Sequence, residues 1–486
     1  MEKLLDKIPL KIWHNLGLAA IALLLWGTIW LTLQYKIWFL LALPLGAIVL
    51  LQVVYNYRPL YYLLIFSIPC SLHYEMGDLA IDVVSEPLML LFLLIFLVNL
   101  ASGKQFNLKG KLYPFHILIF MILFWTAFTT ITSEYPLRSI KFLMSRVWYL
   151  AAFVYIAERI ITRPASIKKI FWAFFVPMVL VSIGITIRHS LDGFSFEQSN
   201  LVPYPIFPNG VVYSATLVLF LPWCWYARTW YSPKSVEWYL IIIGTLILAF
   251  ATIITYKRGA WAAICVLPLI DLAIKRKIFD KLIYVVLLLA TLALGWLLND
   301  NKFYEFAPNY QKTVWHEGDI SGHLAATFTG TEISSMERFY RWVAAKNMIA
   351  DMPVLGAGPS TFNQVYKRYT DDAFRTYVSD NPEQSTTHNY FLLTFSEQGI
   401  IGGLLFIAFC VYMLIQAARL YPRIKDPEMR SFLMLALLSV STILFHSLLN
   451  ELLEVDKVGA MFWLNMLLIH KLTVWHEPEK NGKDRS

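Results

Sequence analysis

The composition of this 486-residue chain excludes an ordinary soluble domain, because 58% of its residues are hydrophobic and only 15% are charged. Soluble domains carry about 25% charged residues. The net charge of +8 needs no nucleic acid to explain it, because basic residues gather at the ends of apolar segments, where anionic lipid headgroups attract them. We therefore expect a multi-pass membrane protein in contact with membrane lipids, and no nucleic-acid partner.

Apolar runs of about 20 residues recur along almost the whole chain, the length that a helix needs to cross a hydrocarbon core of about 30 Å. They predict an all-α polytopic fold with about 12–14 transmembrane helices. The first run lacks a small-residue cleavage pattern, so we expect it to be a retained anchor. The four cysteines lie within these runs, which indicates buried thiols. The predicted spans are 12–33, 36–56, 59–73, 86–101, 113–132, 141–160, 169–187, 210–229, 237–256, 259–274, 281–298, 396–418, 430–447 and 456–471.

Basic residues mark alternate connections between these spans, as in the run at 275–277, and the opposite turns hold few. This asymmetry predicts that both termini are cytoplasmic and that the long polar segment at 299–390 lies outside. We expect three parts, given with their ranges: transmembrane helices 1–11 (1–298), a large helical external loop (299–390), and the C-terminal transmembrane helices with a cytoplasmic tail (391–486).

The external loop contains a predicted amphipathic helix that carries two arginines. Ser334 and Glu337 have capping-box spacing, and apolar residues follow at helical intervals up to Asp351. Arg338 and Arg341 lie about one turn apart on this helix. Guanidinium groups bind a diphosphate well, because their planar fork donates two hydrogen bonds and keeps its charge. The alternative is a salt-bridged face, with Glu337 paired to Arg341.

The glycine-rich turn after this helix, PVLGAGPSTF at 353–362, could start a short helix at Thr361. Backbone amides at a helix start can bind an anion, although such a turn is a weak signal. A further cationic pair, Lys257 and Arg258, lies in the short outside turn KRGAW at 257–261. These two residues are either anion ligands or interfacial cations between belt aromatics.

Three more polar residues lie where an apolar environment makes them costly. His388 precedes the apolar helix HNYFLLTFSEQGIIGG at 388–403, as either a polar cap or a group that exchanges a proton near pH 7. Glu397 lies inside this helix and Arg146 inside an earlier span, so each is expected to have a polar partner. Candidate partners of Arg146 are carboxylates and a histidine at the outer ends of spans: Asp82, Glu86, His446, Glu451, Glu454 and Asp456. No metal-binding or nucleotide-binding motif is present near these candidate site residues.

Three motifs, KRGAW, ERFYRW with the PVLGAGPSTF turn, and HNYFLLTFSEQGIIGG, resemble the bacterial O-antigen ligase and polymerase superfamily over about residues 250–420. The resemblance implies a C-type glycosyltransferase architecture in the bacterial inner membrane. It also implies metal-independent, inverting transfer of a glycan from undecaprenyl diphosphate to a glycan or lipid acceptor at the periplasmic face. No cofactor is implied. Carried over to this chain, Arg258 and Arg338 (or Arg341) would bind the diphosphate, and His388 would be the catalytic base or orient the acceptor. On the charge and burial arguments above, Arg146, Lys257 and Glu397 are possible supporting residues.

Several functions fit these residues. A ligase that moves the glycan to an acceptor such as lipid A core is the first interpretation, and a polymerase that extends the lipid-linked glycan is the second. Protein O-glycosylation is a third use of the same chemistry. A secondary transporter or flippase is the alternative from another class, but transporters generally show related halves, and no internal repeat is evident in this sequence.

Overall fold

The computed structural model describes residues 56–76, 79–102, 113–307, 333–376, 379–381 and 385–476, together with Leu23, Trp26 and Gly27. The chain forms two units, residues 1–66 and 67–486. All but the last residue of helix α4 (Arg58–Ser67) belong to the first unit. The spans predicted at 12–33 and 36–56 lie almost entirely outside the described residues.

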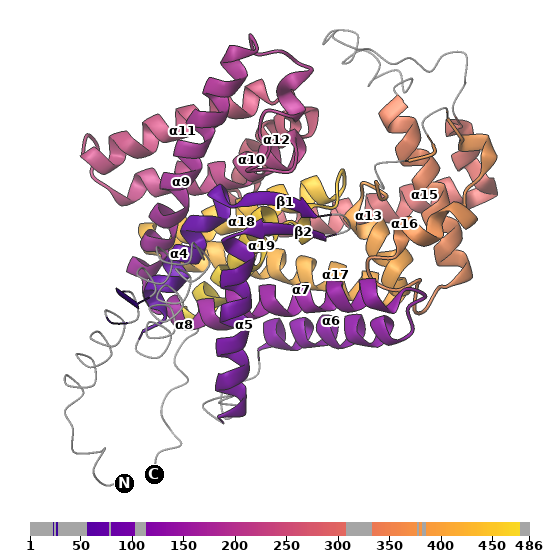
Figure 1. Ribbon diagram of the computed structural model, residues 1–486, viewed down its shortest axis with the longest axis horizontal. Coiled ribbons are helices and arrows are strands. Elements are labelled where there is room, and N and C mark those ends of the chain that lie inside the picture. Colours follow the sequence, from indigo (N-terminus) through magenta and orange to yellow (C-terminus); the bar gives the residue numbers. More distant parts are fainter. Residues whose placement is uncertain are drawn as a thin grey trace. The chain divides into compact units, whose positions relative to one another are not determined.

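In the residues that the structure describes, the regular elements of the second unit are helices and one β-hairpin (Figure 1). Its strands are β1 (Leu72–Met76) and β2 (Leu79–Val83), which pair antiparallel with Leu72 opposite Val83. The segment Ala151–Ile156, labelled η3, is a π-helical stretch that joins α7 to α8. The α-helices are α5 (Ser85–Ala101), α6 (Pro114–Ile131), α7 (Pro136–Leu150), α8 (Ala157–Ile160), α9 (Pro164–Leu191), α10 (Gly210–Ala227), α11 (Val236–Ile254), α12 (Arg258–Lys275), α13 (Phe279–Leu298), α15 (Ile333–Asp351), α16 (Phe362–Val365), α17 (Tyr390–Leu420), α18 (Pro427–Ser447) and α19 (Asp456–Trp475).

The all-α polytopic prediction is confirmed. Within the described residues, nine helical segments are long and apolar enough to cross a membrane. Every span predicted from residue 86 onward overlaps a helix. The protein is therefore a multi-pass membrane protein, as the distribution of apolar residues predicts.

The span predicted at 59–73 is wrong. Helix α4 ends at Ser67, a short turn at Ile68–Cys70 contains Pro69, and strand β1 follows. Proline has no N–H for the α-helical ladder, so the helix does not continue through this turn. The hairpin places His73 Nδ1 3.2 Å from Asp82 Oδ1.

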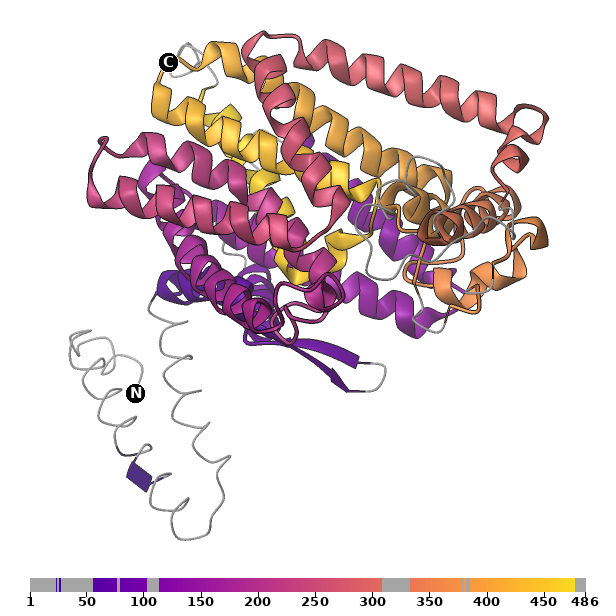
Figure 2. The ribbon, with the colours of Figure 1, turned by 90° about the horizontal axis from the view of Figure 1, so that it is seen from above.

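Helices α10, α18 and α19 form the centre of the second unit, because 78% of the apolar window of each of these spans is buried. Helix α13 is the opposite case. Figure 2 shows it along the edge of the unit, and none of its apolar window is buried. Apart from Phe279 and Ile283 near its start, this apolar helix is not buried, so it is suited to face lipid.

The described part of the predicted external loop is helical and has its own small core. Helix α15 packs its apolar face, including Tyr340 and Met348, against Phe362, Tyr366 and Phe374 from the segment that follows. Helices α15 and α16 lie together beside the start of α17 (Figure 1). The helices of the loop therefore contact the membrane-spanning part of the protein through α17. Ser334, predicted to cap this helix, already lies inside it.

Candidate active site

Helix α15 carries both predicted arginines, and the structure gives them different surroundings. Arg341 is buried, and its Nη1 lies 3.8 Å from Oε2 of the equally buried Glu337. Glu337 Oε1 also accepts hydrogen bonds from the hydroxyls of Ser379, at 2.8 Å, and Thr376. Arg341 is therefore paired with Glu337, as in the salt-bridge alternative to diphosphate binding. Arg338 is half-buried one turn earlier.

His388 lies in the short segment between this loop and α17, with a positive φ of 51°. The indole of Trp342 on α15 donates to the carbonyl of the preceding residue, Thr387, at 2.7 Å. The Nδ1 atom of His388 lies 3.6 Å from Oε2 of Glu451, and about a quarter of each side chain is exposed, 28% and 22%. His388 is therefore held near a carboxylate and remains accessible to a substrate.

The charged groups around His388 have opposing effects on its pKa. Burial lowers the pKa of His388 below its ordinary value, the Glu451 carboxylate raises it, and the Arg341 and Arg338 guanidinium groups lower it further; the net direction is downward. An imidazole with a lowered pKa is neutral at physiological pH, which is the form that accepts a proton. The structure thus brings His388, Arg338 and Arg341 into one electrostatic environment.

Arg146 has the polar partner that its position in a span requires. Its Nη2 atom lies 2.6 Å from Glu454 Oε1 and 2.7 Å from the Tyr390 hydroxyl. Tyr390 donates in turn to Glu454 at 2.6 Å. Glu454 is one of the carboxylates that the sequence offered as a partner, and this part of the prediction is confirmed. Since Tyr390 is the first residue of α17, the network fixes the helix start next to His388.

Lys257 and Arg258 stand at the start of α12. The Lys257 side chain is half-buried against the start of α10: its Cε would lie 3.0 Å from a Cβ placed on Gly210. Burial lowers the pKa of Lys257. Arg258 is the first residue of α12, and a cation at a helix N-terminus is disfavoured by about 0.3–1 kcal/mol. Such a placement is better suited to binding an external anion than to stabilising the helix.

The start of α12 also lies beside the turn that carries Glu451. A Cβ on Gly259 would lie 3.4 Å from Leu449 Cδ1 and 3.8 Å from the His446 ring at the end of α18. Glu451 follows Leu449 by two residues. The structure therefore brings the KRGAW segment to the same end of the helix bundle as His388.

Glu397 holds the glycine-rich turn in place. Its carboxylate is buried and accepts the backbone N–H of Ser360 at 2.8 Å and of Phe362 at 2.9 Å. The carbonyl of Glu397 accepts the N–H of Gly358 at 2.8 Å. The amides at the start of α16, which we considered as an anion site, are thus engaged by a carboxylate of the chain itself. Helix α17 is kinked two residues later at Gly399, whose φ is 68°.

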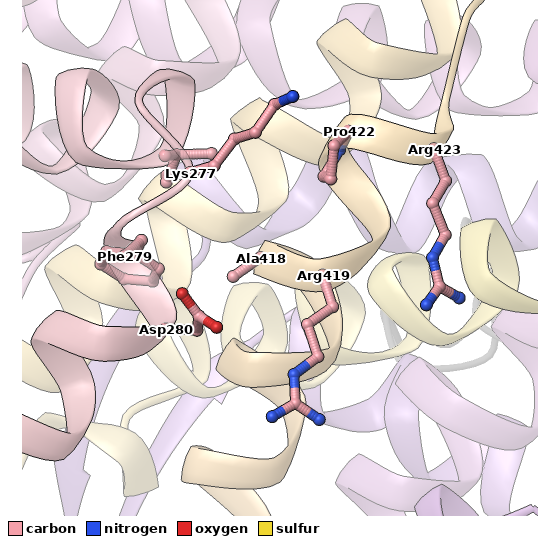
Figure 3. A pocket seen from close by; sticks show the side chains of 8 residues that line it. Lys277, Phe279, Asp280, Ala418, Arg419, Pro422 and Arg423 are labelled. Carbon is pink, nitrogen blue, oxygen red and sulfur yellow. The ribbon is translucent and has the colours of Figure 1, made fainter.

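A crevice of about 260 Å³ lies elsewhere, between the α12–α13 turn and the end of α17 (Figure 3). Its lining includes Lys277, Asp280, Arg419 and Arg423. It contains none of the residues predicted for the site. Its exposed basic side chains are typical of a helix end at the membrane surface.

The family comparison decides the class of the protein. A family model described as O-Antigen ligase matches residues 243–407. For this third of the chain, the match confirms the resemblance to the O-antigen ligase and polymerase superfamily. The matched region contains Arg258, Arg338, Arg341 and His388, but the two carboxylates Glu451 and Glu454 lie beyond it. The matched domain supports a ligase- or polymerase-type function in general, with a lipid-linked glycan and an acceptor as the class of substrates. No curated protein matches the chain.

Sequence reasoning missed two residues of this site. Glu451 was considered only as a partner of Arg146, whereas the structure places it beside His388. Tyr390 was not singled out, although it binds both members of the buried ion pair. A carboxylate in the turn between the last two spans was the available signal for Glu451. The chain has 26 tyrosines, and nothing in the sequence around Tyr390 sets it apart from the others.

Proposed function

We propose that this protein is an O-antigen ligase-like glycosyltransferase that moves a glycan from undecaprenyl diphosphate to an acceptor hydroxyl, such as one on lipid A core. The observation that carries this proposal is the position of His388 within the O-antigen ligase domain, beside Glu451 and within electrostatic reach of Arg338 and Arg341. This arrangement supplies a proton acceptor next to cationic groups that suit a diphosphate.

The reaction would be a single displacement with inversion at the anomeric carbon. The acceptor oxygen forms a bond to this carbon while the bond from the carbon to the phosphate oxygen breaks. His388 takes the proton of the acceptor hydroxyl, and undecaprenyl diphosphate leaves with the bonding electron pair. General-base assistance of this kind contributes about 10²- to 10⁴-fold to the rate.

The leaving diphosphate needs positive charge in place before the reaction begins. We assign this role to Arg258 and Arg338. Arg341 is the less favoured candidate, since its guanidinium lies 3.8 Å from the buried Glu337 carboxylate. Removing that arginine would leave a buried carboxylate without its counter-charge, so its loss would disturb folding as well as binding. Lys257 adds a second cation beside Arg258 and would strengthen the local positive potential.

Metal ions have no role in this transfer step, because the arginines supply the charge that a divalent cation would otherwise provide. We further propose that transfer takes place at the periplasmic face of the bacterial inner membrane. Both termini would be cytoplasmic, the loop at 299–390 periplasmic, and the segments 1–298 and 391–486 would supply the membrane-spanning helices. The bias of basic residues toward one side supports this orientation.

The same chemistry serves a polymerase, in which the acceptor is a hydroxyl of a second lipid-linked glycan. The two functions differ in the product, so one assay separates them. Purified protein in proteoliposomes receives undecaprenyl-diphosphate-linked glycan together with lipid A core, and products on each carrier are resolved. Product on lipid A core identifies a ligase, and a longer lipid-linked glycan identifies a polymerase.

The variants His388→Ala and Arg258→Ala test the assigned residues in this assay. Their matched controls are His476→Ala, at the end of α19, and Arg375→Ala, whose side chain is 56% exposed in the loop. We expect both test variants to lose at least about 100-fold in transfer rate, and both controls to retain it in the presence of chelator. Unchanged transfer in folded His388→Ala and Arg258→Ala would overturn the assigned roles of these residues, whereas no transfer by the parent protein would favour a transporter or flippase.

A further inference from the structure

A cluster of potential metal ligands lies away from the candidate active site. It consists of His116, Glu158 and His470, whose ligand atoms all lie within 4.8 Å of one another. His116 is in the first turn of α6, Glu158 in α8 and His470 near the end of α19. Three separate helices therefore converge on one point with two imidazoles and a carboxylate.

The geometry within the cluster suits a tetrahedral cation. His116 Nε2 lies 3.5 Å from Glu158 Oε2. Ligand atoms bound to zinc at about 2.0–2.2 Å in tetrahedral geometry lie about 3.4 Å apart. The ligand atom of His470 lies within 4.8 Å of the other two, so shifts of the partly exposed His116 and Glu158 side chains would bring all three to this spacing. Two histidines and one carboxylate are a donor set that zinc binds, with a fourth position left for water.

The surroundings favour binding in two further ways. His470 is buried and stacks on Phe115, with ring centroids 4.5 Å apart and planes within 10°, so its ring orientation is fixed. His116 and Glu158 are partly open, with 38% and 33% of their side chains exposed. A cation can thus reach the cluster from solvent. Lys471 Nζ lies 4.0 Å from Glu158 Oε1, the other carboxylate oxygen. This lysine orients the carboxylate but opposes a cation electrostatically.

The cluster and the candidate active site are at opposite ends of the same helices. Helix α6 has 18 residues and so spans about 27 Å. At its far end, the backbone N–H of Glu134 donates to Ala357 in the glycine-rich turn. Helix α19 likewise begins beside Glu454 and reaches His470 after most of its length. The cluster is therefore too remote to take part in glycan transfer.

We propose that His116, Glu158 and His470 bind one divalent transition-metal cation of the Zn²⁺ type, which joins the ends of α6, α8 and α19 on the membrane face opposite the candidate active site. The cation stabilises the relative positions of these helices. The site does not depend on the proposed transfer reaction, and its test needs no substrate.

The test uses the full chain with an affinity tag that contains no histidine, stripped with chelator and then dialysed. Zn²⁺ binding is measured by competition with a chromophoric chelator, and Co²⁺ is added separately to record its visible absorption. We expect one Zn²⁺ per chain, a four-coordinate Co²⁺ spectrum and a higher unfolding temperature with metal. Glu158→Gln and His116→Gln should each weaken binding at least about tenfold.

His476→Gln is the matched control, because this histidine lies at the end of the same helix and its Nδ1 is 2.9 Å from the Leu472 carbonyl, outside the cluster. It should bind Zn²⁺ as the parent does. Lys471→Gln should bind more tightly, since it removes the competing positive charge. The absence of stoichiometric binding, or equal binding by the parent and both ligand variants, would show that the cluster is only an ion pair.

Discussion

The buried network of Arg146, Glu454 and Tyr390 offers a quantitative test of how the site is held. Arg146 is 5% exposed, and its guanidinium contacts a carboxylate and a phenol at 2.6 and 2.7 Å. Its plane also lies over the Phe142 ring at 5.0 Å. Replacing Arg146 with Met retains much of this packing and removes the charge and the hydrogen bonds.

The expected cost follows from the burial of each partner. Breaking a buried ion pair by removing one member costs about 3–5 kcal/mol. The Glu454 side chain remains 27% exposed and keeps Tyr390 as a donor, so Arg146→Met should cost about 3 kcal/mol. Glu454→Gln leaves the more deeply buried guanidinium uncompensated and should cost about 4 kcal/mol. The double variant removes both charges and should cost no more than the worse single variant.

The assay is a double-mutant cycle on the free energy of unfolding, measured for the purified protein in mixed micelles by tryptophan fluorescence. These values predict a coupling energy of about 3 kcal/mol between Arg146 and Glu454. Transfer activity should also fall in Arg146→Met, because Tyr390 begins α17 two residues after His388. Costs that add to within about 0.5 kcal/mol would refute the reasoning, since independent sites behave in that way.

Two further predictions concern the base and the turn. The pKa of His388 is lowered by burial and by the nearby arginines, and raised by Glu451. Glu451→Gln should therefore lower this pKa and shift the acid limb of the pH–rate profile for transfer to lower pH. Arg341→Met should raise the pKa and shift the acid limb to higher pH. An acid limb that stays in place in both variants would exclude His388 as the titrating group. Gly358→Ala should reduce both folded yield and transfer strongly, because the φ of this residue is 106° and a Cβ would lie 2.1 Å from Ser133 Oγ. The control is Gly184→Ala, which has open space around the added Cβ; normal behaviour of Gly358→Ala would contradict the packing described here.

The membrane-spanning helices could be predicted because a single strong signal determines them. About 20 apolar residues in a row satisfy their backbone hydrogen bonds only as a helix within a bilayer. The same signal misled at 59–73, where the apolar run continues into a β-hairpin. Lys457 lies 3.4 Å from Asp82 of this hairpin and 375 positions away in sequence. No local pattern can reveal a partner at that separation.

Site residues could be predicted where a charged side chain lies in a membrane span, because burying it without a partner costs free energy. A charged residue in a span needs a counter-charge, so Arg146 could be expected to have a carboxylate partner, and Glu454 was among the few available. The same reasoning could not decide between Arg338 and Arg341, because their sequence positions on one helix are nearly equivalent. Only the fold separates them, by burying Glu337 between Arg341, Thr376 and Ser379.

The distribution of contacts among four glutamates narrows the choice of catalytic base. Glu337 accepts from two hydroxyls beside Arg341, and Glu397 accepts two backbone amides of the glycine-rich turn. Glu454 accepts from Arg146 and Tyr390. Protonating any of these three would weaken contacts that hold the loop or α17 in place. Glu451 instead faces His388, where it would stabilise the imidazolium that our proposed mechanism forms. With His388 as the proposed base, the contacts by which the other three glutamates support the loop and α17 need not change during the reaction.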